Sequence, residues 1–409
     1  MMRRLAPIAL TILVLATAPA AAQSERYRAR RERLLAELGD GALVAIGAAP
    51  TEILAGDKDF FYLTGLRSDP AVLLAARKDG EVREVLFLPA RNPHRERWDD
   101  VRLFPGPAAT TETGIETRPI GELGAVLVEW KAAAKTFHVA RAGLTGTQSI
   151  GLLDEVLPGS TDPTPAIHQL RLVKDAGELE LLRRAVDLTG NGIVEALRAA
   201  RPGMYEYELQ ALGEFLWRRG GAEREGFDSI LGSGPNACVL HYRANRRQTA
   251  EGDIVVMDVG AEVGGYTADV TRTFPVNGKF TDRQREVYGL VLEAQKAGIA
   301  LCRPGKRVAD VHNAAWFVLA EAGVADHFWH GTSHWLGLDV HDAGDYDTPF
   351  APGMVVTVEP GLYFPDESLG VRIEDDVLIT DGAPVVLSGG IPSTIEGIEA
   401  EMAKEGMFR

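Results

Sequence analysis

The chain has 409 residues, with 43 Lys and Arg against 58 Asp and Glu, which gives a net charge of -15. Hydrophobic residues make up 45% and charged residues 25%, which argues against a disordered, collagen-like or coiled-coil chain. The acidic balance argues against general binding to nucleic acid or anionic membranes, because both require basic surface. Two cysteines, Cys238 and Cys302, are too few for a disulfide scaffold or a Cys-rich zinc site.

Residues 1–22 are expected to form a secretory signal peptide. Arg3 and Arg4 precede an almost wholly apolar run, Leu5 to Pro19, and three small residues, 20–22, follow it ahead of Gln23. The run is short for a membrane span, and an uncleaved anchor is the alternative. We therefore expect export to the periplasm or the medium, with no membrane attachment after cleavage. Export would permit a pairing of the two cysteines, although Cys302 ends an apolar helix pattern typical of a core.

Residues 23–160 are expected to form a small α/β domain. Charged and Leu-bearing residues 26–38 predict an opening helix, and residues 126–135 predict another. Short apolar runs bounded by Gly, Pro or charge predict buried strands at 42–46, 72–75, 85–88 and 136–140. Three prolines with Gly, Ser and Thr in residues 157–165 indicate a linker.

Residues 161–409 contain an internal repeat. A capping-box pattern, Asp175 with Glu178, opens a predicted helix that runs to about residue 200, and a second follows at about 205–219. A second pair of helices is predicted between about 281 and 322, and Arg-Pro-Gly interrupts each pair, at 201–203 and at 303–305. Matching strands follow at 252–258 and 353–359. The repeat predicts two related halves around a pseudo-two-fold axis.

The repeat places two acids in equivalent positions and adds a further acid to each half. Asp258 corresponds to Glu359 at a strand end, and Asp269 and Glu374 lie on the strands that follow. A turn at Gly264-Gly265 would set Asp258 and Asp269 on adjacent antiparallel strands. Four carboxylates gathered at one point would repel one another strongly. A pair of divalent metal ions with a bridging water as nucleophile resolves this repulsion.

The segment between the halves supplies nitrogen ligands. His330, His334 and His341 lie within twelve residues in a glycine-bearing segment. Close to four isolated acids, they are better explained as site residues than as structural histidines. Carboxylates with an imidazole suit manganese, cobalt or zinc better than a metal that prefers thiolates.

These residues resemble the pita-bread metallopeptidases, and among them the group of aminopeptidase P and prolidase. The matching segments are the histidine segment, 258–269, 357–363 (TVEPGLY), 372–376 (RIEDD), and, in the first region, 59–65 (DFFYLTG) and 97–102 (RWDDVR). Residues 333–339 (SHWLGLD) are closer to aminopeptidase P, since prolidase tends to have Gly where Ser333 stands. The resemblance implies a creatinase/aminopeptidase P-like α/β domain over 23–160 and a pita-bread catalytic domain over 161–409.

The resemblance implies five metal ligands: Asp258, Asp269, His334, Glu359 and Glu374. Asp258 would bind one ion through both oxygens, Asp269 and Glu374 would bridge two ions, and His334 and Glu359 would complete the shell of the other. Glu359 would also take the proton of the bridging water and pass it to the leaving nitrogen. Two manganese ions are the favoured cofactor, with cobalt or zinc as alternatives.

The resemblance also implies contacts with the substrate. His241 and His341 match histidines that bind the scissile carbonyl and stabilise the developing oxyanion. His330 matches a third pocket histidine.

Three further residues match substrate-binding positions with open alternatives. Tyr363 and Arg372 fall at pocket positions, although Arg372 could instead be a structural partner of a ligand carboxylate. Trp98 matches an aromatic that lines the proline pocket in some relatives, in some cases from a neighbouring subunit. A plain core or surface role for Trp98 is equally open.

The expected function is hydrolysis of the bond between an N-terminal residue and a following proline, on peptides with proline second. Proline lacks an amide N–H and fixes φ, so general peptidases would stall there. The nearest alternative is a prolidase restricted to Xaa-Pro dipeptides. A metal-free creatinase-type enzyme and a non-catalytic pita-bread binding protein are further alternatives, and intact ligands argue against both. A homo-oligomer, dimer or tetramer, is also expected.

Overall fold

The computed structural model describes residues 20–47, 57–67, 71–78, 80–98, 103–134, 136–140 and 155–407. These residues form two compact units, one ending at Ile167 and the other beginning at His168, and each is described by itself. Residues 1–19 of the predicted signal peptide and residues 99–102 of the RWDDVR motif lie outside the described residues. Within the described ranges, no helix has the length and apolar character needed to cross a membrane.

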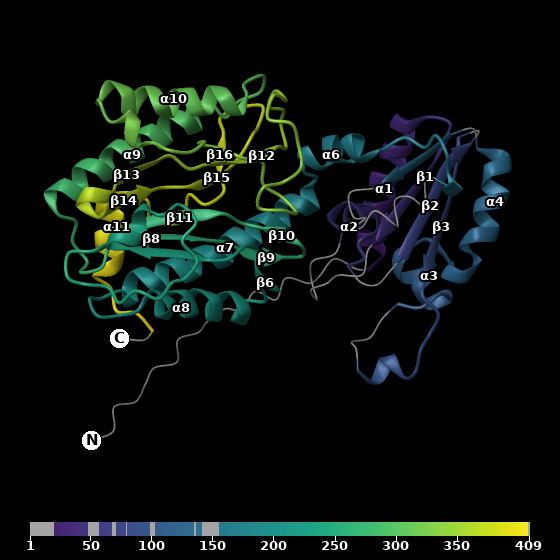
Figure 1. Ribbon diagram of the computed structural model, residues 1–409, viewed down its shortest axis with the longest axis horizontal. Coiled ribbons are helices and arrows are strands. Elements are labelled where there is room, and N and C mark those ends of the chain that lie inside the picture. The colour runs from purple at the N-terminus through teal and green to yellow at the C-terminus, as the bar shows by residue number, and fades with distance from the viewer. Residues whose placement is uncertain are drawn as a thin grey trace. The chain divides into compact units, whose positions relative to one another are not determined.

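The first unit is built on a five-stranded sheet with the order β4-β3-β2-β1-β5 (Figure 1). Its strands are β1 (Gly41–Gly47), β2 (Ala71–Lys78), β3 (Glu81–Leu88), β4 (Glu116–Pro119) and β5 (Thr136–Ala140). Its helices are α1 (Ala20–Leu38), α2 (Lys58–Thr64), α3 (Pro107–Thr113) and α4 (Leu123–Ala133), with 3-10 turns η1 (Arg95–Arg97) and η2 (Ile120–Glu122). The four predicted strands are therefore confirmed. β4, α2 and α3 were not predicted, because short elements carry too few residues to show a period.

The second unit contains six of the labelled helices (Figure 1). They are α6 (Thr164–Leu172), which begins in the first unit, α7 (Ala176–Ala199), α8 (Glu206–Arg219), α9 (Asp282–Ala300), α10 (Val308–Glu321) and α11 (Ile395–Met402). Both long helices open on a capping box, at Asp175 with Glu178 in α7 and at Thr281 with Gln284 in α9. The predicted helices are confirmed to within a few residues at each end.

The strands of the second unit form several small sheets. They are β6 (Arg224–Glu225), β7 (Ile230–Ser233), β8 (Ile254–Val259), β9 (Ala261–Val263), β10 (Tyr266–Thr267), β11 (Val270–Pro275), β12 (Val355–Val358), β13 (Gly361–Phe364), β14 (Leu369–Arg372), β15 (Asp375–Leu378) and β16 (Val385–Val386). The orders are β11-β8-β7, β12-β15-β16, β10-β9-β6 and β13-β14. Short 3-10 turns, η3 (Gly234–Cys238), η4 (Ala325–His327) and η5 (Pro365–Glu367), connect some of them.

The predicted repeat is visible in this element order. Each half has a pair of helices, α7 with α8 and α9 with α10, followed by a strand, β8 or β12. Each of these strands pairs with an antiparallel partner, β11 or β15. The two halves meet where the Glu374 N–H donates to the Thr271 carbonyl at 3.1 Å. Each half therefore contributes one pair of antiparallel strands, β8 with β11 and β12 with β15, to the region where the halves meet.

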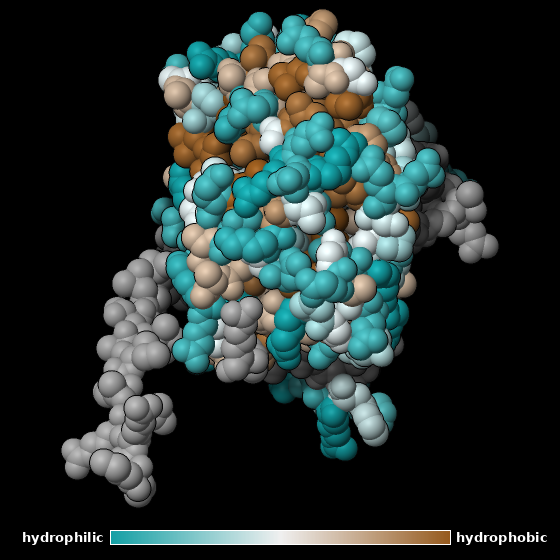
Figure 2. Space-filling model, turned by 90° about the vertical axis from the view of Figure 1, so that its left-hand side faces the viewer, coloured by the Kyte–Doolittle hydropathy of each residue, from teal (hydrophilic) through white to brown (hydrophobic). Residues whose placement is uncertain are grey.

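One face of the second unit carries an apolar area on α10. Figure 2 shows hydrophobic side chains gathered in the upper part of this face, where α10 lies, above a mainly hydrophilic part. Trp316 and Phe317 of α10 are 41% and 62% exposed and contact each other edge to face. Nothing in the described residues covers them. Both cysteines are free, and Cys302 is buried in the core, as its helix pattern predicts.

Candidate active site

Four acids lie at the ends of the paired strands. Asp258 is on β8 and Glu359 directly follows β12. Asp269 directly precedes β11, and Glu374 directly precedes β15. The second acids were expected on strands, and the structure places both in short breaks between strands. The repeat therefore yields the four acids in two equivalent pairs.

The hairpin that carries Asp269 depends on two glycines. Gly264 and Gly265 have φ of 60° and 86°, a left-handed conformation that suits a two-residue turn between antiparallel strands. The turn brings Thr271 opposite Asp258 in the β8–β11 ladder, so Asp269 lies beside Asp258. The predicted turn at this position is confirmed.

The imidazole of His334 points at three of the acids. Its Nε2 lies 3.4 Å from Asp269 Oδ2, 3.6 Å from Glu359 Oε1 and 4.0 Å from Glu374 Oε1. Its Nδ1 donates to the Trp335 carbonyl at 3.1 Å, which leaves the Nε2 lone pair free for a metal ion. Ligand atoms of Asp269, His334 and Glu374 all lie within 4.8 Å of one another.

The chemistry of these groups fits a cation. Asp258 Oδ1, Asp269 Oδ1 and Glu374 Oε1 are buried and have no hydrogen-bond partner among the described residues. Buried polar atoms are normally paired, so three unpartnered carboxylate oxygens on residues that line one cavity indicate a missing positive partner. Oxygen and imidazole ligands suit manganese, cobalt or zinc. The residues present therefore fit the expected metal centre.

Burial, and then mutual repulsion, raises the pKa of three of the acids. Burial, and then the neighbouring Asp258, raises the pKa of Asp269 well above its usual range. Burial, and then the neighbouring Asp269, raises the pKa of Glu374 well above its usual range. Burial raises the pKa of Glu359 to about 7. Without a cation, these groups hold protons that two divalent ions would displace.

The acids line a cavity of about 520 Å³ in the second unit. The predicted residues His241, His330, His341 and Arg372 also line it. The ring of His341 lies 4.3 Å from that of His334, and burial lowers the pKa of His341 to about 4. His341 is therefore neutral at ordinary pH, and one of its two ring nitrogens carries a proton.

A hydrogen-bonded chain forms another part of this wall. Arg372 Nη2 donates to Asp258 Oδ2 at 2.7 Å, and its Nη1 donates to the Tyr363 hydroxyl at 3.0 Å. The hydroxyl lies 2.8 Å from His330 Nε2 and can donate to it. The other ring nitrogen, Nδ1, then donates to the Gly331 carbonyl at 2.8 Å. Burial lowers the pKa of His330 to about 4, in keeping with a neutral ring.

Trp98 is not among the residues of the second unit that line this cavity. It lies in the first unit and its side chain is 79% exposed. Its predicted contact with substrate proline stays a prediction.

Several residues of the site were not predicted from the sequence. Thr271 donates from Oγ1 to Glu374 Oε2 at 2.7 Å. The cavity is also lined by Phe227, Asp228, Arg243, Val340 and Tyr346. Thr271 could have been found from its spacing, two residues after Asp269, whereas the others lie in loops without a pattern.

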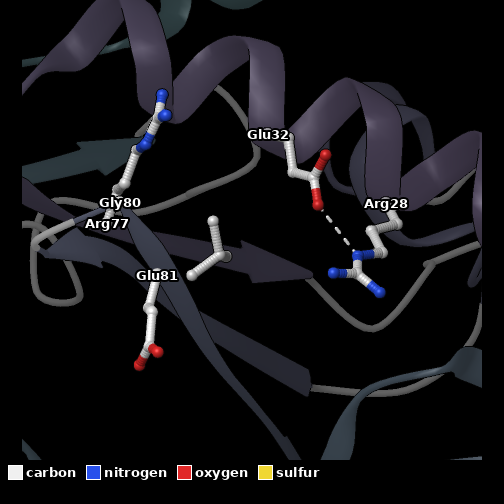
Figure 3. Close-up of a pocket in the computed structure, with 6 residues that line it drawn as sticks. Arg28, Glu32, Arg77, Gly80 and Glu81 are labelled. Carbon is white, nitrogen blue, oxygen red and sulfur yellow. Dashed lines mark hydrogen bonds and ion pairs between the residues drawn. The ribbon is translucent and has the colours of Figure 1, made fainter.

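A cavity in the first unit has a different character. It measures about 480 Å³ and lies between α1 and the β2–β3 hairpin. Figure 3 shows Arg28 paired with Glu32 on α1, while Arg77 and Glu81 point in opposite directions. Charges that do not converge cannot act together on one substrate atom, so the catalytic site is assigned to the second unit.

Comparison with known proteins agrees with this geometry. Residues 180–381 match the profile of metallopeptidase family M24, and residues 27–139 match that of the aminopeptidase P N-terminal domain. The chain is 34% identical to the Xaa-Pro aminopeptidase of Escherichia coli K12, over 92% of this chain and 97% of that protein.

Solved structures agree as well. Proline aminopeptidase P II of Yersinia pestis is 33% identical with a TM-score of 0.86, covering 93% of this chain and 99% of that one. Aminopeptidase P of E. coli with the inhibitor Pro-Leu is 32% identical with a TM-score of 0.86, covering 93% and 98%. The expected α/β architecture with a pita-bread catalytic domain is therefore confirmed. The chain belongs to metallopeptidase family M24, in its aminopeptidase P group.

Proposed function

We propose that this chain is a Xaa-Pro aminopeptidase, which releases the first residue of peptides that carry proline second. The observation that carries the proposal is the convergence of four acids and the His334 imidazole, with three orphaned carboxylate oxygens, beside His241 and His341. The similar proteins are named Xaa-Pro aminopeptidase, and the inhibitor bound to the E. coli enzyme begins with proline.

The proposed cofactor is a pair of divalent ions, with manganese favoured. Asp258, Asp269, His334, Glu359 and Glu374 would hold them. When bound, the ions supply a Lewis acid and a water of lowered pKa. Oxygen-rich ligand sets favour manganese over metals that prefer sulfur.

The protein's own groups move the proton and hold the carbonyl. Glu359 accepts a proton from the attacking water and delivers it to the proline nitrogen as the peptide bond breaks. His341 and His241 donate to the scissile carbonyl oxygen as negative charge develops on it. His330, Tyr363 and Arg372 form a hydrogen-bonded chain beside the same cavity, which fixes the orientation of the His330 ring.

Arg372 also bears on peptide length. A dipeptidase requires a cation for the C-terminal carboxylate of its substrate, and Arg372 is a cation that lines the cavity. Its guanidinium is already bound to Asp258 and to the Tyr363 hydroxyl, and burial removes it from solvent. Arg372 is therefore not free to bind the C-terminal carboxylate of a dipeptide.

The test compares peptides of matched first residue with added manganese. Ala-Pro, Ala-Pro-Gly-Gly and Ala-Ala-Gly-Gly are incubated with the protein and the products are identified by mass spectrometry. We expect free Ala from Ala-Pro-Gly-Gly at the highest kcat/KM. Hydrolysis of the dipeptide alone would replace the assignment with prolidase, and equal hydrolysis of the Ala-Ala peptide would remove the proline specificity.

We further propose that the protein is exported and then cleaved after Ala22, as the layout of residues 1–22 supports. Expression with and without residues 1–22, followed by cell fractionation and N-terminal sequencing, tests this.

A homo-oligomer is also proposed, and light scattering of the purified protein tests it.

A further inference from the structure

Two charged side chains line the active-site cavity without a role in the hydrolysis. They are Asp228 and Arg243. Arg243 Nη1 lies 3.2 Å from Asp228 Oδ2, and both side chains are 63% exposed. An ion pair this open to solvent contributes little to the stability of the fold, so its two side chains can separate at a small cost in free energy.

The backbone places this pair next to the reacting groups. Asp228 lies two residues before Ile230, which is the ladder partner of Asp258. Arg243 lies two residues after His241. Two extended residues span at most about 6.6 Å, so Asp228 and Arg243 each lie within about one long side chain of a residue beside the catalytic groups, Ile230 and His241.

The other charged groups that line the cavity have their partners already. Arg372 is bound to Asp258 and Tyr363, and the remaining acids are the proposed metal ligands. Among the described lining residues, only the exposed pair is left to meet a charged group of the substrate. The first residue is the nearest substrate side chain, because its Cα is bonded to the scissile carbonyl carbon.

We propose that Asp228 binds the cationic side chain of the substrate's first residue, so that peptides beginning with Arg or Lys are preferred. The inference rests on the proposed aminopeptidase function. The Arg243 guanidinium stands in for the guanidinium of the substrate, and its contact with Asp228 shows that such a group fits there. A substrate Arg displaces Arg243, whereas a neutral first residue leaves the pair intact.

The experiment measures the ratio of kcat/KM for Arg-Pro-Gly-Gly to that for Ala-Pro-Gly-Gly in the manganese-loaded full-length mature protein. Asp228→Asn is expected to lower this ratio about fivefold, the size of one exposed ion pair. Arg243→Gln is expected to raise it, because the competing guanidinium is gone. Added salt is expected to lower the ratio in the parent protein and not in Asp228→Asn, because salt screens an exposed charge pair.

Arg246→Gln is the matched control. Arg246 lies in the same loop and is exposed, but it stacks on Tyr207 and does not line the cavity. For Arg246→Gln, the ratio of kcat/KM for Arg-Pro-Gly-Gly to that for Ala-Pro-Gly-Gly is expected to equal that of the parent protein. An unchanged ratio in both Asp228→Asn and Arg243→Gln would overturn the inference while leaving the aminopeptidase function in place. Absence of cleavage of Ala-Pro-Gly-Gly by the parent protein would instead remove the proposed function itself.

Discussion

Arg372 Nη2 donates to Asp258 Oδ2 at 2.7 Å, across the boundary between the two repeated halves. Arg372 belongs to β14 of the second half and Asp258 to β8 of the first. Asp258 Oδ1 is buried and has no hydrogen-bond partner among the described residues, and Asp258 lines the cavity. One oxygen of Asp258 is thus held by Arg372, while the other has no partner among the described residues. The guanidinium is meanwhile withdrawn from any role in binding a peptide carboxylate.

Asp269→Asn is expected to lose at least one metal ion and nearly all activity. The change removes a proposed ligand from a buried cluster in which ligand atoms of Asp269, His334 and Glu374 lie within 4.8 Å of one another. Elemental analysis after manganese loading and desalting measures the loss. The exposed Asp381→Asn serves as control and should keep the parent metal content. A variant that retains about two ions per chain would take Asp269 out of the ligand set.

Thr271→Val is expected to weaken manganese binding roughly 10- to 100-fold, because Thr271 holds Glu374 in place without touching the metal. Valine has nearly the same shape but cannot donate to Glu374 Oε2. Competition with a metal-binding dye measures the affinity independently of activity. Thr271→Ser keeps the hydroxyl and should restore most of the affinity. Equal affinities in the valine and serine variants would show that the hydrogen bond does not matter.

His341→Ala is expected to keep its metal and to lose roughly 100- to 1,000-fold in kcat. The proposed role of His341 is to donate one N–H to the substrate oxygen, and its loss would leave the proposed ligand atoms unchanged. Metal content and kcat are measured on the same preparation. A variant that cannot hold metal would place His341 among the ligands.

The metal-free protein is expected to lose stability as the pH rises from 6.5 to 8. The folded state raises the pKa of Asp269 and Glu374 well above their usual range and that of Glu359 to about 7, through burial and then mutual repulsion. In the unfolded chain these groups titrate near pH 4. The folded state therefore holds more protons in this window, and its stability falls as they are lost.

The window begins at pH 6.5 because buried histidines act the other way below it. The lowered pKa of His330 and His341, about 4 for each, makes stability rise with pH until about 6.5. Tm is measured from pH 6.5 to 8 with a chelator and with manganese. Manganese should remove most of the decline. Glu225, whose pKa burial raises to about 7 outside the site, should leave a smaller residual slope. If the Tm of the metal-free protein instead rose from pH 6.5 to 8, the explanation by raised pKa values of the buried acids would be contradicted.

Much of the site could be predicted because its acids are tied to a repeat. The equivalence of Asp258 and Glu359 follows from two matching apolar strands, and Gly264-Gly265 indicates the turn that brings Asp269 back. Asp228 and Arg243 could not be found in this way. They lie in loops, and only the folded chain shows that both line the cavity.

In the first unit, too, elements with a clear sequence pattern could be predicted, and an element without one could not. The apolar runs of β1, β2, β3 and β5 predict buried strands, and all four are present. β4 has only four residues and no buried ones, so no pattern marks it. It joins the sheet through its parallel pairing with β3, a contact set by tertiary structure rather than by local preference.

The most direct test of the metal-dependent aminopeptidase is a manganese titration of the chelated protein with Ala-Pro-Gly-Gly as substrate. We expect no hydrolysis without metal, a rise in rate that levels off near two ions per chain, and free Ala with Pro-Gly-Gly as the products. Hydrolysis that persists in chelator, or cleavage at a bond other than Ala-Pro, would contradict the account.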